Sequence, residues 1–247
     1  SDLASSGLPN PDELKLLEPF RSQLPPELFT QPFTLPVTDG SGNNRKELLT
    51  AFKLLEQADW RVKNMQLVNP KGESMSFSIV LPDPSFERVA IPYAETLKHL
   101  GINVQVRTVD PAQFQHMADN FEIDMTMWIY AQGDVPGIEL LDYWSCKAAT
   151  TTGSTNLPGI CSPVIDALIE KVITAPDRPT LRTAARALDR VLLWGWYMVP
   201  GWDSDTFHVA FWNRFGQPDI PIREGVNFDC WWVDAVKAAK TDAARRA

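Results

Sequence analysis

The order of hydrophobic and polar positions predicts alternating helices and strands in the middle of the chain. Apolar residues repeat with a period near 3.6 over residues 45–59, which predicts a helix with one buried side. Alternation of apolar and polar residues predicts strands over residues 75–81 and 102–109, with a helix over residues 85–100 between them. This order predicts a partly parallel sheet with helices on its faces.

A further strand leads into the first candidate for a ligand site. Residues 111–120 predict a short helix, and residues 121–130 predict a strand that continues directly into the loop 131–137. The strand and loop together carry an aromatic ring, an amide and a carboxylate on Tyr130, Gln132 and Asp134. In open α/β sheets, ligands bind at the carboxyl ends of strands. We therefore predict that these three residues form one wall of a ligand site.

The pattern divides the chain into three parts. The first, residues 1–44, holds seven prolines, fits one helix over residues 11–24 and otherwise predicts an extended arm on a larger body. Residues 45–205 predict an α/β lobe. Its last helices span residues 163–173, with Ser162 as the cap, and a stretch that begins at Asp177. Residues 206–247 form a C-terminal segment that begins with a predicted strand over residues 207–212.

Composition excludes several classes of protein. The chain has 247 residues, of which 44% are hydrophobic and 22% charged, so it is globular and long enough to bury a large core. A net charge of −8 argues against a nucleic-acid-binding surface. No apolar run approaches the roughly 20 residues that cross a bilayer. The first residues also lack the features of a signal peptide, but such a segment is removed in mature proteins.

Cysteine spacing leaves two interpretations open. Cys146 and Cys161 flank a loop rich in Thr, Gly, Ser and Asn. They form either a disulfide, worth about 3 kcal/mol for a loop of this length, or two buried free thiols. Cys230 is interpreted as a packed thiol. No Cys or His spacing indicates a metal site, so neither a metal nor a cofactor is predicted.

Catalysis has little support in the sequence. None of the three histidines lies in a recognised catalytic spacing. The carboxylates near the loop could serve a glycoside hydrolase, but structural roles are favoured for those outside the loop itself. These acids are Asp124, Asp134, Glu139 and Asp142. Trp128 is interpreted as a core residue, whereas Trp202 is a candidate for a ligand wall or for packing at a hinge.

Several short motifs, taken in order, resemble one family. They are the helix that ends at Trp60, the run Glu95-Thr-Leu-Lys-His-Leu-Gly-Ile, Phe121-Glu-Ile-Asp-Met, Gly153-Ser-Thr-Asn with the helix after Cys161, and Phe228-Asp-Cys-Trp-Trp. Together they resemble the periplasmic solute-binding proteins of ABC importers, of the peptide/oligopeptide type (family 5). The best match is the oligopeptide/microcin-like subfamily.

The resemblance implies an α/β fold with a mixed, mostly parallel sheet flanked by helices, namely the C-terminal lobe of such a protein. It implies a non-catalytic periplasmic protein that binds peptides or peptide-like solutes in a cleft between two lobes and delivers them to an inner-membrane permease. The other lobe would lie outside this chain, and residues 206–247 would return toward it. An oxidising compartment also favours the disulfide between Cys146 and Cys161.

The family's site residues transfer unevenly. Its acid for the peptide amino terminus falls at Gly133, one residue before Asp134, and its arginines for a peptide carboxylate fall at Ala118 and Met127. Asn156 and Trp202 complete the predicted ligand-binding set. Two alternatives stay open, a glycoside hydrolase with paired carboxylates and a scaffold of the same fold that docks a receptor.

Overall fold

The chain forms two compact units. The computed structural model describes residues 2–130, 135–202, 206, 208–219 and 226–246. Unit 1 is Ser1–Tyr197 and unit 2 is Met198–Ala247. The division into an arm, a lobe and a return segment at residues 44 and 205 stays a prediction about the whole protein.

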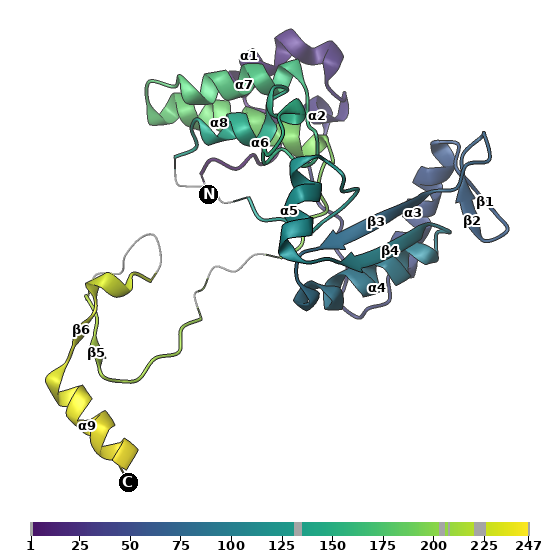
Figure 1. The fold of residues 1–247 in the computed structure, drawn as a ribbon. Helices are drawn as coiled ribbons and strands as arrows, with labels where there is room; N and C mark the ends of the chain where they lie inside the picture. Colours follow the sequence, from purple (N-terminus) through teal and green to yellow (C-terminus); the bar gives the residue numbers. More distant parts are fainter. Residues whose placement is uncertain (1, 131–134, 203–205, 207, 220–225, 247) are drawn as a thin grey trace. The chain divides into compact units, whose positions relative to one another are not determined.

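Helices form the larger core of unit 1. In chain order they are α1 (Pro11–Leu17), η1 (Glu18–Gln23), α2 (Glu27–Thr30), α6 (Glu139–Trp144), η3 (Ala148–Thr150), α7 (Pro163–Ile173) and α8 (Arg178–Trp194). Figure 1 shows α1, α2 and α6 gathered around α7 and α8. Ile165, Ile169 and Ala187 are fully buried between them. The predicted period of 3.6 is thus confirmed for both long helices.

The caps of α7 and α8 follow the sequence only in part. The helix predicted to begin at Asp177 is confirmed as α8, and Asp177 caps it, because its carboxylate accepts from the backbone N–H of Thr180 at 2.8 Å. Ser162 occupies the N-cap position of α7, but its side chain makes no capping hydrogen bond, so that prediction is wrong. The backbone of Ser162 still accepts from Asp166 N–H at 3.0 Å.

The proline-rich arm lies on this helical core. Its predicted helix is confirmed as α1 followed by the 3-10 turn η1, and Pro19 lies in the first turn of η1. Pro19 has no N–H to continue the α-helical hydrogen bonds, which accounts for the tighter turn. Leu17 and Leu28 are fully buried against α7 and α8. The arm therefore contributes to the core of unit 1.

A parallel pair of strands forms the second part of unit 1. Strand β3 (Ser76–Leu81) pairs with β4 (Asn103–Thr108) from Ser76 opposite Asn103 to Leu81 opposite Thr108. The remaining elements of this part are α3 (Arg45–Gln57), β1 (Arg61–Lys63), β2 (Gln66–Val68), η2 (Pro84–Phe86), α4 (Glu87–Lys98) and α5 (Pro111–Asp119). The predicted β-α-β order is confirmed here.

Gly101 allows a close approach between α4 and the β1–β2 hairpin. It follows α4 with a φ of +80°, and its carbonyl accepts from the backbone N–H of Leu67 at 2.8 Å. A Cβ at this position would lie 2.8 Å from the nitrogen of Leu67. Glycine is therefore required both by the backbone angle and by the contact.

The strand predicted over residues 121–130 does not form, which corrects the sequence interpretation. The segment touches β3 at one bridge, between Ile79 and Met125, where Val80 N–H donates to the Met125 carbonyl at 2.9 Å. Side chains replace the rest of the ladder. The Asp124 carboxylate accepts from the backbone N–H of Ser78 at 2.9 Å, and the Thr126 hydroxyl donates to the Val80 carbonyl at 2.7 Å.

Unit 2 is small and rich in aromatic residues. It consists of β5 (Phe215–Gly216), η4 (Phe228–Cys230), β6 (Trp232–Val233) and α9 (Ala235–Arg246), with β5 antiparallel to β6. The strand predicted over residues 207–212 is absent from 208–212, and Phe207 lies outside the described residues. Phe211 packs its ring against Trp231 at 4.7 Å instead. Alternation alone therefore predicted the wrong segment as a strand.

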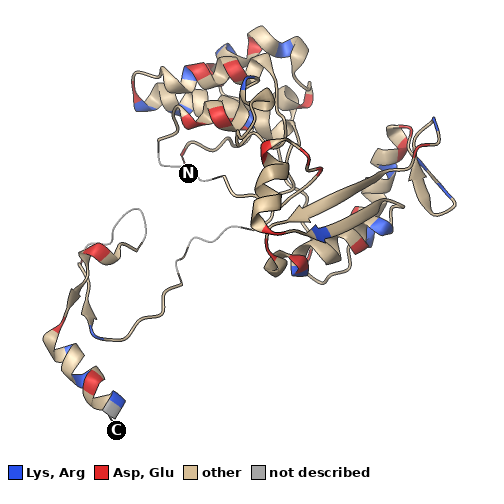
Figure 2. Cartoon of the chain, viewed as in Figure 1, with Lys and Arg blue, Asp and Glu red and all other residues tan. Residues whose placement is uncertain are grey.

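The fold class is confirmed as α/β. Within the described residues, the strands form one parallel pair and two antiparallel pairs, so the single mixed sheet predicted from the sequence is replaced by three small ones. Acidic and basic residues are interspersed along the helices of unit 1 (Figure 2), which fits a solvated surface. Among the described residues, no helix is long and apolar enough to cross a membrane.

Candidate functional site

Tyr130 is the last described residue before the predicted ligand loop. Its ring packs against Trp144 at 4.4 Å and Tyr143 at 5.4 Å between ring centroids. Its hydroxyl donates a long hydrogen bond of 3.4 Å to the carbonyl of Thr155. The ring of Tyr130 is thus held by α6, and its hydroxyl is held by the loop that follows α6.

The environment of Tyr130 keeps its hydroxyl protonated. Burial raises the pKa of Tyr130 to about 12, and the nearby Tyr143 adds to this shift. Burial removes water from the hydroxyl, and this loss of hydration costs the charged phenolate more free energy than the neutral form. At neutral pH the hydroxyl is therefore a hydrogen-bond donor with lone pairs left to accept.

Aliphatic side chains lie exposed on either side of the loop. Ile129 is 85% exposed, Val135 67% and Ile138 75%. Ile129 is exposed while the next residue, Tyr130, packs inward, as expected for an extended segment. Trp128 stacks on Phe114 at 6.5 Å and is 41% exposed, so it is only partly in the core. The rim of the loop is therefore apolar.

The remaining predicted loop residues, Gln132 and Asp134, lie outside the described residues. Their role stays a prediction. Trp202 is 64% exposed and belongs to unit 2. Its ligand role also stays a prediction.

The predicted disulfide between Cys146 and Cys161 is present. Asn156 lies in the loop that this disulfide closes, and it is fully buried. Its amide donates to the carbonyls of Ser145 at 3.0 Å and Ile160 at 2.8 Å, and its oxygen accepts from Ile160 N–H at 2.9 Å. Asn156 thus holds the loop together from within, and its ligand role stays a prediction.

The acids near the loop have structural partners. Glu139 accepts from the backbone N–H of Gly137 at 2.8 Å, and Asp124 is bonded to β3 as described above. Asp142 accepts from both the N–H of Thr155 at 3.2 Å and its hydroxyl at 2.5 Å. The sequence singled out Asp142 only as an acid near the loop and gave no signal for Thr155, because their partnership depends on the fold.

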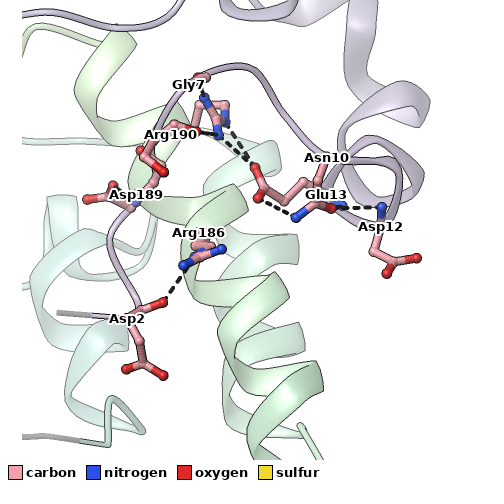
Figure 3. Close-up of polar contacts among 10 residues, drawn as sticks. Asp2, Gly7, Asn10, Asp12, Glu13, Arg186, Asp189 and Arg190 are labelled. Atoms are coloured by element: carbon pink, nitrogen blue, oxygen red, sulfur yellow. Dashed lines mark hydrogen bonds and ion pairs between the residues drawn. The ribbon is translucent and has the colours of Figure 1, made fainter.

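A buried ion pair fixes the start of the arm on α8 (Figure 3). Arg190 donates to the Glu13 carboxylate at 2.8 Å, and both side chains are nearly inaccessible, at 1% and 3% exposure. Arg190 also donates to the carbonyl of Gly7 at 2.7 Å, while Asn10 donates to Glu13 at 2.8 Å. Because every charged group here has partners within the chain, this cluster is structural.

Other features give no alternative site. An open cavity of about 350 Å³ lies between α3 and the end of α4, lined by Asn44, Arg45, Leu48 and His99 among others. No residue predicted from the sequence as a site residue lies there. Among the described residues, no group of three or more His, Cys, Asp or Glu side chains could hold a metal ion.

Comparison with known proteins gives clear relatives. No protein-family model matches the chain. Over 94% of its length the chain is 43% identical to an uncharacterized protein, y4wM, of Sinorhizobium fredii, and 39% identical to a probable peptide-binding protein, YejA, of Agrobacterium fabrum. Over 89% of its length it is 32% identical to a peptidoglycan-binding protein, YepA, of Agrobacterium fabrum. The chain spans only 35%, 38% and 36% of these three curated relatives.

Solved structures agree on the fold. The oligopeptide-binding protein AppA of Bacillus subtilis, solved with a nonapeptide, matches with a TM-score of 0.54 and 18% identity over 75% of this chain and 38% of its own. NikZ of Campylobacter jejuni, solved with Ni(L-His), matches with a TM-score of 0.54 and 14% identity over 60% and 30%. The predicted resemblance to peptide-type binding proteins is thus confirmed, and the fold is that of periplasmic binding proteins.

Proposed function

We propose that this chain is part of the substrate-binding component of an ABC-type importer. The whole protein binds peptides or peptide-like solutes in a cleft between two lobes, in the periplasm, and delivers them to an inner-membrane permease without catalysis. The observation that carries the proposal is the Tyr130 wall, an aromatic cluster beside a loop with an apolar rim. Binding pockets combine such apolar walls with a few placed polar groups.

Peptides are the favoured ligand class because two relatives carry matching descriptions. One is a probable peptide-binding protein and the other a peptidoglycan-binding protein. Peptides derived from the cell wall would satisfy both descriptions. In this proposal Tyr130 and Gln132 contact the ligand, Asp134 pairs with its free amino group, and Trp202 and Asn156 make weaker contributions.

A second lobe outside this chain completes the cleft in this proposal. The chain spans about 35–38% of three curated relatives, so the whole protein would have room for another lobe. Unit 2 exposes Trp212, Phe228 and Trp232 by more than half of their surface. Large contiguous patches of exposed apolar side chains mark interaction sites, and we propose that these residues form one. Residues 206–247 would therefore return toward the further lobe and pack on it.

Catalysis is disfavoured by the partners of the nearby acids. Asp124, Glu139 and Asp142 each accept hydrogen bonds from backbone N–H groups of the chain. A general acid or base must instead face a substrate proton within hydrogen-bond distance. Turnover of a glycoside or of a peptide by the purified protein would favour the hydrolase alternative.

The direct test is ligand binding by the whole protein. Native mass spectrometry of protein purified from its host without denaturation should show a co-purifying peptide-sized mass. Calorimetric titration should then show that Asp134→Ala weakens binding of the alanine tripeptide. N-acetylated alanine tripeptide, which has no free amino group, should bind with equal affinity to the protein with and without this substitution. Asp177→Ala, in the cap of α8, is the matched carboxylate control. Unchanged tripeptide affinity in folded Asp134→Ala protein would overturn the anchor assignment.

A further inference from the structure

Thr155 connects Tyr130 to a carboxylate of α6. Its N–H and its hydroxyl both donate to Asp142, at 3.2 Å and 2.5 Å, while its carbonyl accepts from Tyr130. Two bonds to one carboxylate oxygen hold the nitrogen and the side chain of Thr155 against α6. The Thr155 carbonyl, in the next peptide group, also accepts from the backbone N–H of Leu157 at 2.8 Å. Asp142 therefore anchors the residue whose carbonyl accepts from Tyr130, while Leu157 N–H also binds that carbonyl.

The loop that carries Thr155 is closed twice. The disulfide joins Cys146 to Cys161, and Asn156 joins the residues before them, Ser145 and Ile160, through three hydrogen bonds. The backbone N–H of Cys146 also donates to Asp166 of α7 at 3.0 Å. This loop is thus a fixed support against the core, although it contains few apolar residues.

Helix α6 acts on Tyr130 at two points. Its residues Tyr143 and Trp144 contact the Tyr130 ring, and its residue Asp142 acts on the hydroxyl through Thr155. A single helix thereby contacts the ring and anchors the residue that accepts from the hydroxyl. A core tyrosine packed only by apolar neighbours would not need this second connection.

We propose that Asp142 and Thr155 are positioning residues for ligand binding, and that they make the Tyr130 oxygen an acceptor for an N–H group of the ligand. The proposal rests on the proposed function, because it takes Tyr130 as part of the binding wall. The Tyr130 hydrogen is donated to Thr155, so only the oxygen lone pairs stay available. A peptide amide or an ammonium group supplies the matching donor, whereas an ester or carbonyl oxygen does not.

The first experiment measures the exposure of Tyr130 without any ligand. Tetranitromethane nitrates accessible tyrosines, and peptide mapping gives the rate at Tyr130 relative to Tyr93, a partly buried tyrosine of α4. Asp142→Ala should raise this ratio severalfold, and Thr155→Val should raise it less because the Thr155 N–H still reaches Asp142. The control Asp177→Ala should leave the ratio unchanged. An unchanged ratio in both test variants would overturn the positioning role.

The second experiment is a double-mutant cycle on binding of the alanine tripeptide by the full protein. Asp142→Ala should weaken binding about tenfold, and Tyr130→Phe by a similar factor, because both remove the oriented acceptor. Their combination should weaken binding little more than Tyr130→Phe alone. A loss of affinity in the double variant equal to the product of the two single losses would show that Asp142 acts independently of Tyr130, and it would overturn the proposal.

The two experiments separate the failure of this proposal from that of the proposed function. A wild-type protein that binds no peptide would overturn the proposed function and the ligand role of Tyr130 with it. The nitration ratio would still decide whether Asp142 and Thr155 hold Tyr130. Peptide binding with an unchanged nitration ratio would keep the proposed function and overturn the positioning alone.

Discussion

Unit 1 and unit 2 use hydrophobic residues in opposite ways. Unit 1 buries them in three clusters, and members of each cluster come from elements far apart in the chain. In unit 2, Ala238 is the one buried hydrophobic residue among those that the structure describes, while Trp212 is 60% and Trp232 52% exposed. Hydrophobic content alone therefore does not make a core.

The difference indicates where the stability of each unit originates. Burial of apolar surface is the dominant favourable contribution to folding, and it is available to unit 1 from within its own sequence. The aromatic residues of unit 2 contact each other around Trp231, but Phe211 stays 45% exposed and Phe228 57%. We expect unit 1 to fold by itself and unit 2 to need further protein surface.

The largest effect is expected from breaking the buried ion pair in unit 1. Arg190→Met leaves the Glu13 carboxylate buried without its charged partner, so unfolding should require about 3–5 kcal/mol less free energy. Chemical denaturation followed by circular dichroism measures this change. Arg178→Met, which removes an exposed pair with Asp2, should cost far less. Equal losses in the two variants would contradict the role given to burial.

Removing the disulfide should have the next largest effect. Replacing both Cys146 and Cys161 by serine frees a loop with a sequence separation of 15, which should cost about 3 kcal/mol. Thermal unfolding with and without the substitutions measures the loss. Cys230, interpreted from the sequence as a packed thiol, is in fact exposed in unit 2, which corrects that interpretation. Cys230→Ser is therefore the matched control and should not change the stability of unit 1. A loss as large in the control would be inconsistent with two separate units.

The smallest effect is expected from deleting unit 2. Every residue of the three buried clusters precedes residue 198. A chain that ends at Tyr197 should therefore keep its free energy of unfolding to within about 1 kcal/mol, as measured by thermal unfolding. The separate peptide 198–247 should show no cooperative unfolding, because α9 is a short helix in which Ala238 is the one buried hydrophobic residue among those described. Cooperative melting of that peptide would refute the comparison between the units.

The helices were predictable because their signals are local. In α7 and α8 the apolar residues recur every three or four positions, and Asp177 lies directly before the helix that it caps. Alternation in residues 121–130 and 208–212 was equally clear but did not produce strands. A strand needs a partner, and the alternating pattern contains no information about whether one is present.

The candidate site was predictable to a smaller extent. Tyr130 was singled out by its place at the end of an apolar segment, and the structure adds its contacts with α6 and with Thr155. Asn156 was predicted as a ligand residue from a family motif, yet its amide binds the backbone of its own loop. A polar residue in a loop gives the same sequence signal whether it faces a ligand or the interior.

The sequence by itself determined the helices, the α/β class and the pair of cysteines that flank one loop, because these depend on residues near one another in the chain. Only the tertiary structure decided the partners of the charged and polar groups. Glu13 meets Arg190 across 177 positions, and Asp124 meets Ser78 across 46. Their pairing depends on desolvation and geometry that exist only once the elements have packed.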